Sequence, residues 1–379
     1  MDEDDYRYII CRTVTGEQLA EAFPLDAPWA RKLNQKASGT ATFSLDDDRN
    51  IDIIADDTLT SEWVRELVIE RKSTGNPVYG GLITGSKYKM TGNMLTVDHT
   101  DFRALVGKRS TEGEDGYSTI NYRGEYHLYS KQSIINLLWR LMVEGPTTGY
   151  PLNFTHRNVD ALDPAQHDGT DSRDYYDYNL PWTDKSIDEL MNSEGGPDVD
   201  YPFEWDENRR FRWLGRTGTT AQPSLIGNTW KFDLTAPEPG LFDVEVTRNG
   251  DNMATDVIVA GAGAGLDRKF AVARMDTELA LQRMVSMSTI DDVAVLQSHA
   301  NAQLATYSSA TIQWSFWVLA DGTPDGAPAV DQIQLGDIFE VYSNGLPRIP
   351  NGVTNLRVIG KSANRGKRVD IEVQPIGGL

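Results

Sequence analysis

Short apolar runs separated by turn residues dominate residues 66–106. The first run covers residues 67–69, and a second follows at residues 78–84. Turn residues at 73–77 lie between them, and this order predicts a β-hairpin. Paired glycines in the second run favour a bulge or a sharp bend, and a further turn at residues 91–93 leads into another strand. Successive bent hairpins are typical of a small antiparallel barrel or sandwich.

Apolar runs and period-two alternation predict strands elsewhere in the chain. In one of the clearest, Ala41, Phe43 and Leu45 share a face. The other predicted strands cover residues 6–14, 203–205, 211–214, 229–232, 242–246, 256–260, 269–273, 312–318, 338–342, 355–359 and 369–373. The polar residues 15–21, which precede Pro24, are interpreted as a helix-capable stretch.

Three helices are predicted from capping residues and apolar faces. Ser130 caps residues 131–144, in which six apolar side chains form a wide face that predicts burial. Capping boxes begin at Ser186 and at Thr289, and they predict helices that run to about Ser193 and to Tyr307. Residues 146–183 carry many Asp, Tyr, Pro and Gly residues, and we interpret them as a long surface loop.

The order of these elements predicts a mainly β chain with α/β portions. A chain of 379 residues is too long for one compact core, so several domains are expected. We expect two small antiparallel β-barrel modules, a mixed α/β domain and an inserted helix. The predicted domains are an N-terminal β-barrel at 1–125, the mixed α/β domain at 126–224, a second β-barrel at 225–265 and 308–379, and a helical insert or linker at 266–307.

The charge balance narrows the possible partners. With 36 basic and 56 acidic residues the formal net charge is −20, whereas binding to phosphate backbones or anionic membranes needs clustered Lys and Arg. No run approaches 18 apolar residues, so no membrane span is expected. The acidic start, MDEDDYRYII, differs from a signal peptide, which needs basic residues there.

Cys11, the single cysteine, lies in an apolar run and is expected to be a buried small hydrophobe in a protein from a reducing compartment.

Possible metal ligands occur in the predicted 146–183 loop. A set formed by His156, His167, Asp168, Asp171 and Asp174 has a spacing that fits no ligand template, so a polar surface excursion is the preferred interpretation. The acidic run at residues 46–48 is likewise interpreted as a solvated turn, because the later ligands of a Ca²⁺ loop are missing. We therefore expect no metal site.

Catalytic and cofactor motifs are also weak. The glycine-rich residues 261–266 resemble a dinucleotide-binding turn, but Leu266 stands where the third glycine belongs and a strand-like run follows. Neither Gly-x-Ser-x-Gly nor His-Glu-x-x-His occurs. A pair of carboxylates for glycoside cleavage stays open as a possibility, because the distance between two such groups depends on the fold and is not set by their spacing in the sequence. Tryptophans 29, 63, 139, 182, 205, 213, 230, 314 and 317 are candidates for a sugar site, although core packing is the default. We expect no enzymatic activity, no catalytic residues and no cofactor.

Three stretches carry a family resemblance. They are Ala30-Arg31-Lys32-Leu33-Asn34 through Phe43-Ser44-Leu45, the hairpin at 67–83 with its continuation to Leu105, and Leu335-Gly336-Asp337 with the runs at 339–341 and 356–360. In this order and spacing they resemble the baseplate-hub or tail-associated (minor tail) proteins of long-tailed bacteriophages. The resemblance spans nearly the whole chain.

The resemblance implies a homotrimeric hub that closes the tail tube at the tail tip. Two similar barrels per chain would let three chains present six barrels to a hexameric tail ring. The implied partners are the distal tail protein ring, the C-terminus of the tape-measure protein and other tail-tip or fibre proteins, while genomic DNA passes through without specific binding. The implied location is the virion, after assembly in the host cytoplasm.

Two alternatives stay open. The first alternative is a carbohydrate-binding receptor protein of the same tail tip. The second alternative is a cell-wall hydrolase. The sequence ends at Leu379 with no appended lysozyme, peptidase or fibre domain, so a role in cutting cell walls is not expected.

Overall fold

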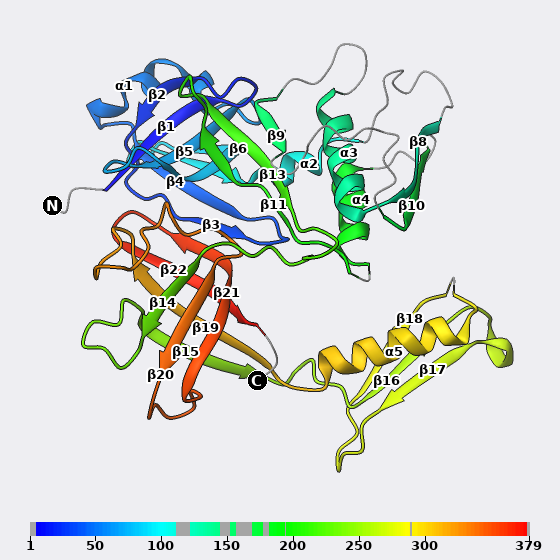
Figure 1. The fold of residues 1–379 in the computed structure, drawn as a ribbon. Helices are drawn as coiled ribbons and strands as arrows, with labels where there is room; N and C mark the ends of the chain where they lie inside the picture. Colours follow the sequence, from blue (N-terminus) through cyan, green and yellow to red (C-terminus); the bar gives the residue numbers. More distant parts are fainter. Residues whose placement is uncertain are drawn as a thin grey trace. The chain divides into compact units, whose positions relative to one another are not determined.

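The chain forms two compact units in the computed structural model (Figure 1). The structure describes residues 5–110, 122–144, 152–156, 169–176, 182–193, 195–288 and 290–376. Unit 1 comprises Met1–Asp243 and Phe316–Ile376, and unit 2 comprises Val244–Ser315 with Gly377–Leu379. Strands outnumber helices in both, so the predicted mainly β fold with α/β portions is confirmed.

The predicted hairpins of the first module form one antiparallel sheet in the order β2-β1-β5-β6-β7-β4. Its strands are β1 (Tyr6–Arg12), β2 (Gln18–Ala22), β4 (Ser38–Ser44), β5 (Arg65–Arg71), β6 (Pro77–Lys89) and β7 (Met94–Thr100). The segment that follows β2 reaches β4 through an isolated bridge between Asp26 and Thr42. No strand ladder between the described residues joins β2 to β4 and closes the sheet.

Two details of this sheet differ from the sequence interpretation. The helix-capable residues 15–21 contribute to strand β2, because a turn that contains Gly16, with φ +68°, folds them back onto β1. The paired glycines 80 and 81 are in regular register with β5, and the register shifts on β6 lie on either side of them, between Pro77 and Tyr79 and between Ile83 and Gly85. Gly80 lies instead where an added Cβ atom would come within 2.3 Å of the Phe211 ring.

Short helical segments cover parts of the first module. They are η1 (Asp48–Asn50), α1 (Ile51–Ala55), η2 (Asp57–Thr60) and α2 (Phe102–Val106). The Asp47 side chain accepts a hydrogen bond from the backbone N–H of Arg49 at 3.1 Å. The acidic run at residues 46–48 is therefore a helix-capping turn, close to the solvated turn expected from the sequence.

A mixed α/β module packs onto the first sheet. Its described elements are β8 (Tyr122–Tyr129), α3 (Lys131–Glu144), β9 (Phe154–His156), β10 (Asp171–Tyr176), α4 (Thr183–Met191), β11 (Val199–Asp200), β12 (Phe203–Trp205) and β13 (Phe211–Thr217). Helix α3 has its predicted bounds, and Ser130 Oγ accepts from the Ser133 N–H at 3.1 Å. Its apolar face shares a core with Phe102, Phe211 and Trp213. The two modules of unit 1 are therefore joined by a common hydrophobic core.

Two predictions for this module were wrong. Helix α4 begins at Thr183 rather than at Ser186, because the first turn is held by a backbone bond from Thr183 N–H to the Arg109 carbonyl, at 3.1 Å, instead of by a side-chain cap. Within the predicted loop at 146–183, residues 154–156 form strand β9, which pairs parallel with β13, and residues 171–176 form strand β10, which pairs antiparallel with β8. The rest of that loop lies largely outside the described residues.

The second large sheet has the order β14-β20-β21-β22-β19-β15. Its strands are β14 (Thr229–Asp233), β15 (Phe242–Asn249), β19 (Thr311–Leu319), β20 (Ile338–Ser343), β21 (Gly352–Ala363) and β22 (Arg368–Pro375). Strands β14 and β20 are parallel, which departs from the expected antiparallel module. The alternating residues of β19 place Trp314, Phe316 and Val318 in the core, as predicted.

Unit 2 contains a three-stranded sheet in the order β17-β16-β18 and one long helix. Its elements are β16 (Asp256–Ala260), η5 (Gly265–Asp267), β17 (Phe270–Arg274), β18 (Gln282–Ser286) and α5 (Val293–Tyr307). Helix α5 ends at the predicted Tyr307, and Asp292 caps it by accepting from the Ala294 N–H at 2.7 Å. Among the described residues, no helix is both long enough and apolar enough to cross a membrane.

Candidate functional site

Strand β3 (Trp29–Lys32) connects the two large sheets of unit 1. It pairs antiparallel with β21, with Arg31 opposite Lys361, and the ladder extends through a bond from Leu33 N–H to the Ile359 carbonyl at 2.8 Å. On its other side the backbone of Thr40 in β4 donates to the Pro28 carbonyl at 3.0 Å. The chain thus crosses from the first sheet to the second at β3. We call the polar contacts around this strand the junction, and its members are Arg31, Asn34, Asp198, Asp200, Arg216, Asp337 and Lys361.

A buried group of ion pairs lies at the centre of the junction. Arg31 donates to Asp200 Oδ1 at 2.7 Å and to the Tyr201 carbonyl at 3.1 Å, and Arg216 donates to Asp200 Oδ2 at 3.1 Å. Arg216 also donates to the carbonyl of Leu335, in the second sheet's module. Because a charge out of water is stable only when it is paired, each of these side chains holds the others in place. The group joins all three modules of unit 1.

A buried lysine lies beside this group. Lys361 donates to the backbone carbonyls of Ile333, at 2.8 Å, and Val330, at 3.2 Å. Burial and the charge of the adjacent Arg31 lower the pKa of Lys361 to about 7, although Asp337 opposes the shift. Near neutral pH the junction can therefore take up a proton at this position.

A second polar contact connects the mixed module to both sheets. Asn34 Nδ2 donates to Asp198 Oδ1 at 2.6 Å, and its Oδ1 accepts from the Val199 N–H at 2.8 Å. The other carboxylate oxygen of Asp198 accepts from Arg357 of β21 and from the Leu225 N–H. Asn34 has a positive φ of 61°, a conformation that Asn adopts more readily than most residues. Its backbone turn and its side chain both suit this contact.

The Leu335-Gly336-Asp337 turn organises the start of the second sheet. The fully buried Asp337 accepts from the Asn228 N–H at 2.8 Å, the Gln334 N–H at 2.9 Å and Trp230 Nε1 at 3.0 Å. Gly336 has φ +92°, which favours glycine. These bonds align β14 with β20, so this motif positions a strand of the second sheet.

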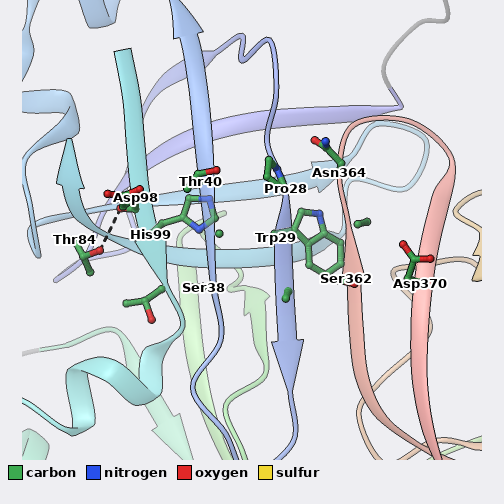
Figure 2. Close-up of a pocket in the computed structure, with 14 residues that line it drawn as sticks. Pro28, Trp29, Ser38, Thr40, Thr84, Asp98, His99, Ser362, Asn364 and Asp370 are labelled. Carbon is green, nitrogen blue, oxygen red and sulfur yellow. Dashed lines mark hydrogen bonds between the residues drawn. The ribbon is translucent and has the colours of Figure 1, made fainter. Parts of the chain in front are cut away.

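An open cleft of about 620 Å³ lies beside the junction (Figure 2). Trp29 of β3 and His99 of β7 line it on one side, and Ser362, Asn364 and Asp370 line it from the β21–β22 hairpin. The Tyr79 hydroxyl lies 2.9 Å from His99 Nδ1, and burial lowers the pKa of His99 to about 4. The imidazole is therefore neutral at physiological pH.

The residues considered as metal ligands are not brought together in the described part of the chain. Asp171 pairs with Lys131 at 2.9 Å, while His167 and Asp168 lie outside the described residues, as do the side chains of His156 and Asp174. No group of three or more His, Cys, Asp or Glu positioned for a metal occurs among the residues the structure describes.

Other candidate positions are part of the fold. Cys11 is fully buried, and burial raises the pKa of its thiol, so it is a packed hydrophobe as predicted. The glycine-rich residues 261–266 connect β16 to β17, which return antiparallel, so they do not open the helix that a dinucleotide turn requires. Trp139, Trp213 and Trp314 are buried, whereas Trp182 is 45% exposed.

Parts of the chain that are distant in the sequence meet at the junction. Residues 30–34, 335–337 and 356–360, which belong to the stretches that carry the resemblance, meet there. Sequence reasoning did not identify Asp198, Asp200 or Arg216 as members. Their only signal is an acidic residue on each side of Val199 in a short apolar context, and this is too weak to predict a buried ion pair.

Comparisons with known proteins follow the fold rather than the sequence. No family model matches the chain, and no curated protein matches it. A tail protein from Neisseria meningitidis MC58 is 14% identical with a TM-score of 0.55, and the match covers 97% of this chain and 96% of that one. The 43 kDa tail protein of prophage MuSo2 from Shewanella oneidensis is 8% identical with a TM-score of 0.58, over 97% and 98% of the two chains.

A third similar structure comes from a different kind of assembly. A chain of a PdpA–VgrG complex is 8% identical with a TM-score of 0.52, and the match covers 100% of this chain and 66% of that one. At these identities the likeness concerns the fold. The chain shares the fold of the two tail proteins along nearly its whole length, as the resemblance in the sequence implied.

Proposed function

We propose that the chain is a structural hub protein of a phage tail tip and has no enzymatic activity. The observation that supports this most directly is the likeness in fold to two tail proteins over 97% of the chain. A match of that extent includes both large sheets, the mixed module and unit 2, and leaves little of the chain for a separate catalytic domain.

The architecture suits this role. Each of the two large sheets has six strands along its main hydrogen-bonded path, and β3 and the junction combine the sheets in one compact unit. Two β modules per chain give six modules in a trimer, and six quasi-equivalent positions match a hexameric tail ring. In this proposal the hub closes the tail tube, adapts sixfold tail symmetry to threefold tip symmetry and opens for DNA passage.

The proposed partners follow from this position. They are the distal tail protein ring, the C-terminus of the tape-measure protein and other tail-tip or fibre proteins. Genomic DNA would pass through without specific binding, and the net charge of −20 supports this because it disfavours retention of a polyanion. The location would be the tail tip of the virion, after assembly in the host cytoplasm.

The predicted domain division is part of the same proposal. A first β module at 1–125, a mixed domain at 126–224 and a second β module at 225–265 and 308–379 would form the ring. The segment 266–307 would be an insert, although residues 256–260 (β16) form one sheet with β17 and β18 and belong with them to unit 2.

The solution mass of the purified protein tests this proposal. We expect light scattering after size exclusion to give the mass of three chains of 42.2 kDa, and a stable monomer without affinity for tail proteins would contradict the hub. Two further assays address the alternatives. Saturable binding to host cell-wall glycans would favour a receptor protein, and clearing in a zymogram on host walls would favour a hydrolase.

A further inference from the structure

The far end of strand β6 has a free edge. Strand β5 pairs with β6 only as far as Leu82, and the Trp63 N–H continues this side with a bond to the Ile83 carbonyl at 2.7 Å. Residues 85–89 pair with β7 on one side and have no strand on the other side in the part of the chain that the structure describes. Unpaired backbone groups of this kind can take one further strand. We call residues 85–89 the open edge.

The charged side chains of the open edge are both basic. Lys87 and Lys89 are exposed and share one face of the strand, and neither forms an ion pair or a side-chain hydrogen bond within the described residues. Tyr88 points to the other face and is 57% exposed. Lysines on an edge deter pairing with a second edge of the same kind. A strand that binds here therefore needs acidic side chains at alternate positions.

Three acids lie near the open edge, and none of them forms an ion pair with its two lysines. Asp98 lies opposite Gly85 on β7, and the exposed Glu62 comes just before the segment that bonds to β6. Asp46 accepts a hydrogen bond from Asn93 Nδ2 at 2.6 Å. The β7 residues directly opposite the two lysines are uncharged. Both lysines are thus available to a partner strand.

The start of the chain has the matching pattern. Asp2, Glu3 and Asp4 precede the described residues, and we call residues 1–4 the arm. In an extended strand Asp2 and Asp4 share one face and are separated by about 6.8 Å, which is also the strand spacing of Lys87 and Lys89. A strand formed by the arm therefore places one carboxylate opposite each lysine.

The arm cannot reach the open edge of its own chain. The Asp5 carbonyl accepts from the Lys72 N–H at 2.8 Å and Tyr6 lies opposite Arg71, which places the start of β1 level with Pro77 at the near end of β6. Lys87 lies ten residues further along the chain, and at strand spacing this is about 33 Å. Four extended residues span at most about 14 Å. An arm on the open edge must therefore come from another chain.

We propose that the arm of one chain adds as a strand to the open edge of a second copy of the same chain, with Asp2 and Asp4 against Lys87 and Lys89. This inference rests on the proposed function, because it names a contact between subunits of the hub. Each chain of a trimer gives one arm and receives one. The contact is heterologous, so it is compatible with a closed ring whose angle is set by the rest of the interface.

Charge reversal with rescue tests the contact. Two cross-strand charge pairs are lost and become repulsive in Lys87→Glu/Lys89→Glu, so we expect the concentration at which the trimer dissociates to rise roughly tenfold. Adding Asp2→Lys and Asp4→Lys to the same chain should restore the wild-type value. Lys185→Glu/Lys269→Glu changes two other exposed lysines and serves as the matched control. Light scattering over a dilution series measures all four proteins.

The outcomes separate the arm contact from the hub. A trimeric wild type whose reversed variant dissociates at the wild-type concentration would overturn the arm contact alone. A loss that the reversed arm does not restore, or that the control shares, would overturn it as well. A monomeric wild type would contradict both the hub and the arm contact. Unfolding curves identify any variant that fails to fold.

A crosslink gives a second readout that leaves the four charges in place. With Asp2 and Asp4 against the two lysines, Glu3 lies opposite Tyr88 whether the strands are parallel or antiparallel. Cys11 is buried, so Glu3→Cys/Tyr88→Cys supplies the accessible thiols.

Under mild oxidation we expect this double variant to give disulfide-linked species of two and three chains. Glu3→Cys/Met284→Cys, in which the second thiol replaces an 82% exposed side chain elsewhere, should remain unlinked. A disulfide within one chain, equal linkage in the control, or no linkage at all would overturn the proposal.

Discussion

Arg31 carries more of the stability of unit 1 than its place in a four-residue strand suggests. It is 7% exposed and is bonded to Asp200, which in turn is bonded to Arg216. The removal of Arg31 leaves the buried Asp200 carboxylate with only one of its two arginine partners. The loss of one partner from a buried ion pair usually lowers the free energy of unfolding by about 3–5 kcal/mol. We therefore expect Arg31→Ala to lower the free energy of unfolding by that amount in urea titrations.

Arg12 offers a matched control for this prediction. It also pairs with an acid, Glu17, at 3.4 Å, but both side chains are about half exposed. Exposed pairs contribute roughly 0–1 kcal/mol, so Arg12→Ala should leave the unfolding midpoint almost unchanged. Equal losses of unfolding free energy in Arg31→Ala and Arg12→Ala would show that the buried ion pairs stabilise the fold no more than an exposed pair does.

Glu66 gives a prediction about pH. Burial raises its pKa from 4.5 to about 8, and the bond from Trp213 Nε1, at 2.9 Å, opposes the shift only in part. The folded-state pKa lies above the unfolded one, so the stabilisation by the protonated carboxyl is full below about pH 4.5 and is lost as the pH rises toward 8. Gln preserves the acceptor without a charge, so the stability of Glu66→Gln relative to wild type should grow across this range.

Thermal melts of the two proteins between pH 4.5 and pH 8.5 measure this difference. The gain in melting temperature of Glu66→Gln should increase steadily and level off above pH 8. A difference that does not change with pH would mean that Glu66 is already ionised in the folded protein. Glu66→Ala should lose stability at every pH, because it leaves Trp213 Nε1 without its acceptor.

At the scale of elements, β6 shows how closely the modules are packed. An added Cβ atom at Gly80 would lie 2.3 Å from Phe211 Cζ, whereas at Gly85 on the same strand the nearest atom is Asp98 Oδ2 at 3.5 Å. Overpacking of a filled core usually costs about 1–3 kcal/mol. We expect Gly80→Ala to lose stability in that range in denaturant titrations and Gly85→Ala to stay close to wild type.

Strand β6 and its neighbours show which features of the fold the sequence predicts and which it does not. The hairpin at 67–84 and helix α3 follow from local signals, namely a turn cluster and a cap before an apolar face, and both are confirmed. Strand β2 was missed because its residues become a strand only through pairing with β1. The paired glycines predicted a bulge or a sharp bend, but an added Cβ atom would meet the Phe211 ring of β13 at Gly80, and Tyr79 and His99 at Gly81.

The candidate site at the junction could likewise be predicted from the sequence only in part. Residues 30–34 were identified by their resemblance to a family pattern, not by any periodicity that indicates a buried arginine. A charged residue in a strand is normally interpreted as solvent-facing, and only the tertiary structure shows that Asp200 neutralises Arg31. The junction's partners on β11 and β13 were therefore beyond the reach of sequence patterns.

At the scale of the whole molecule, the central claim is that three chains present six β modules around an opening. The two large sheets, each with six strands along its main hydrogen-bonded path, are the structural basis of this proposal. Electron microscopy of the purified full-length protein tests it most directly. We expect class averages of a threefold ring with six similar densities around a central channel, and single-chain particles or a ring without sixfold pseudosymmetry would contradict the account.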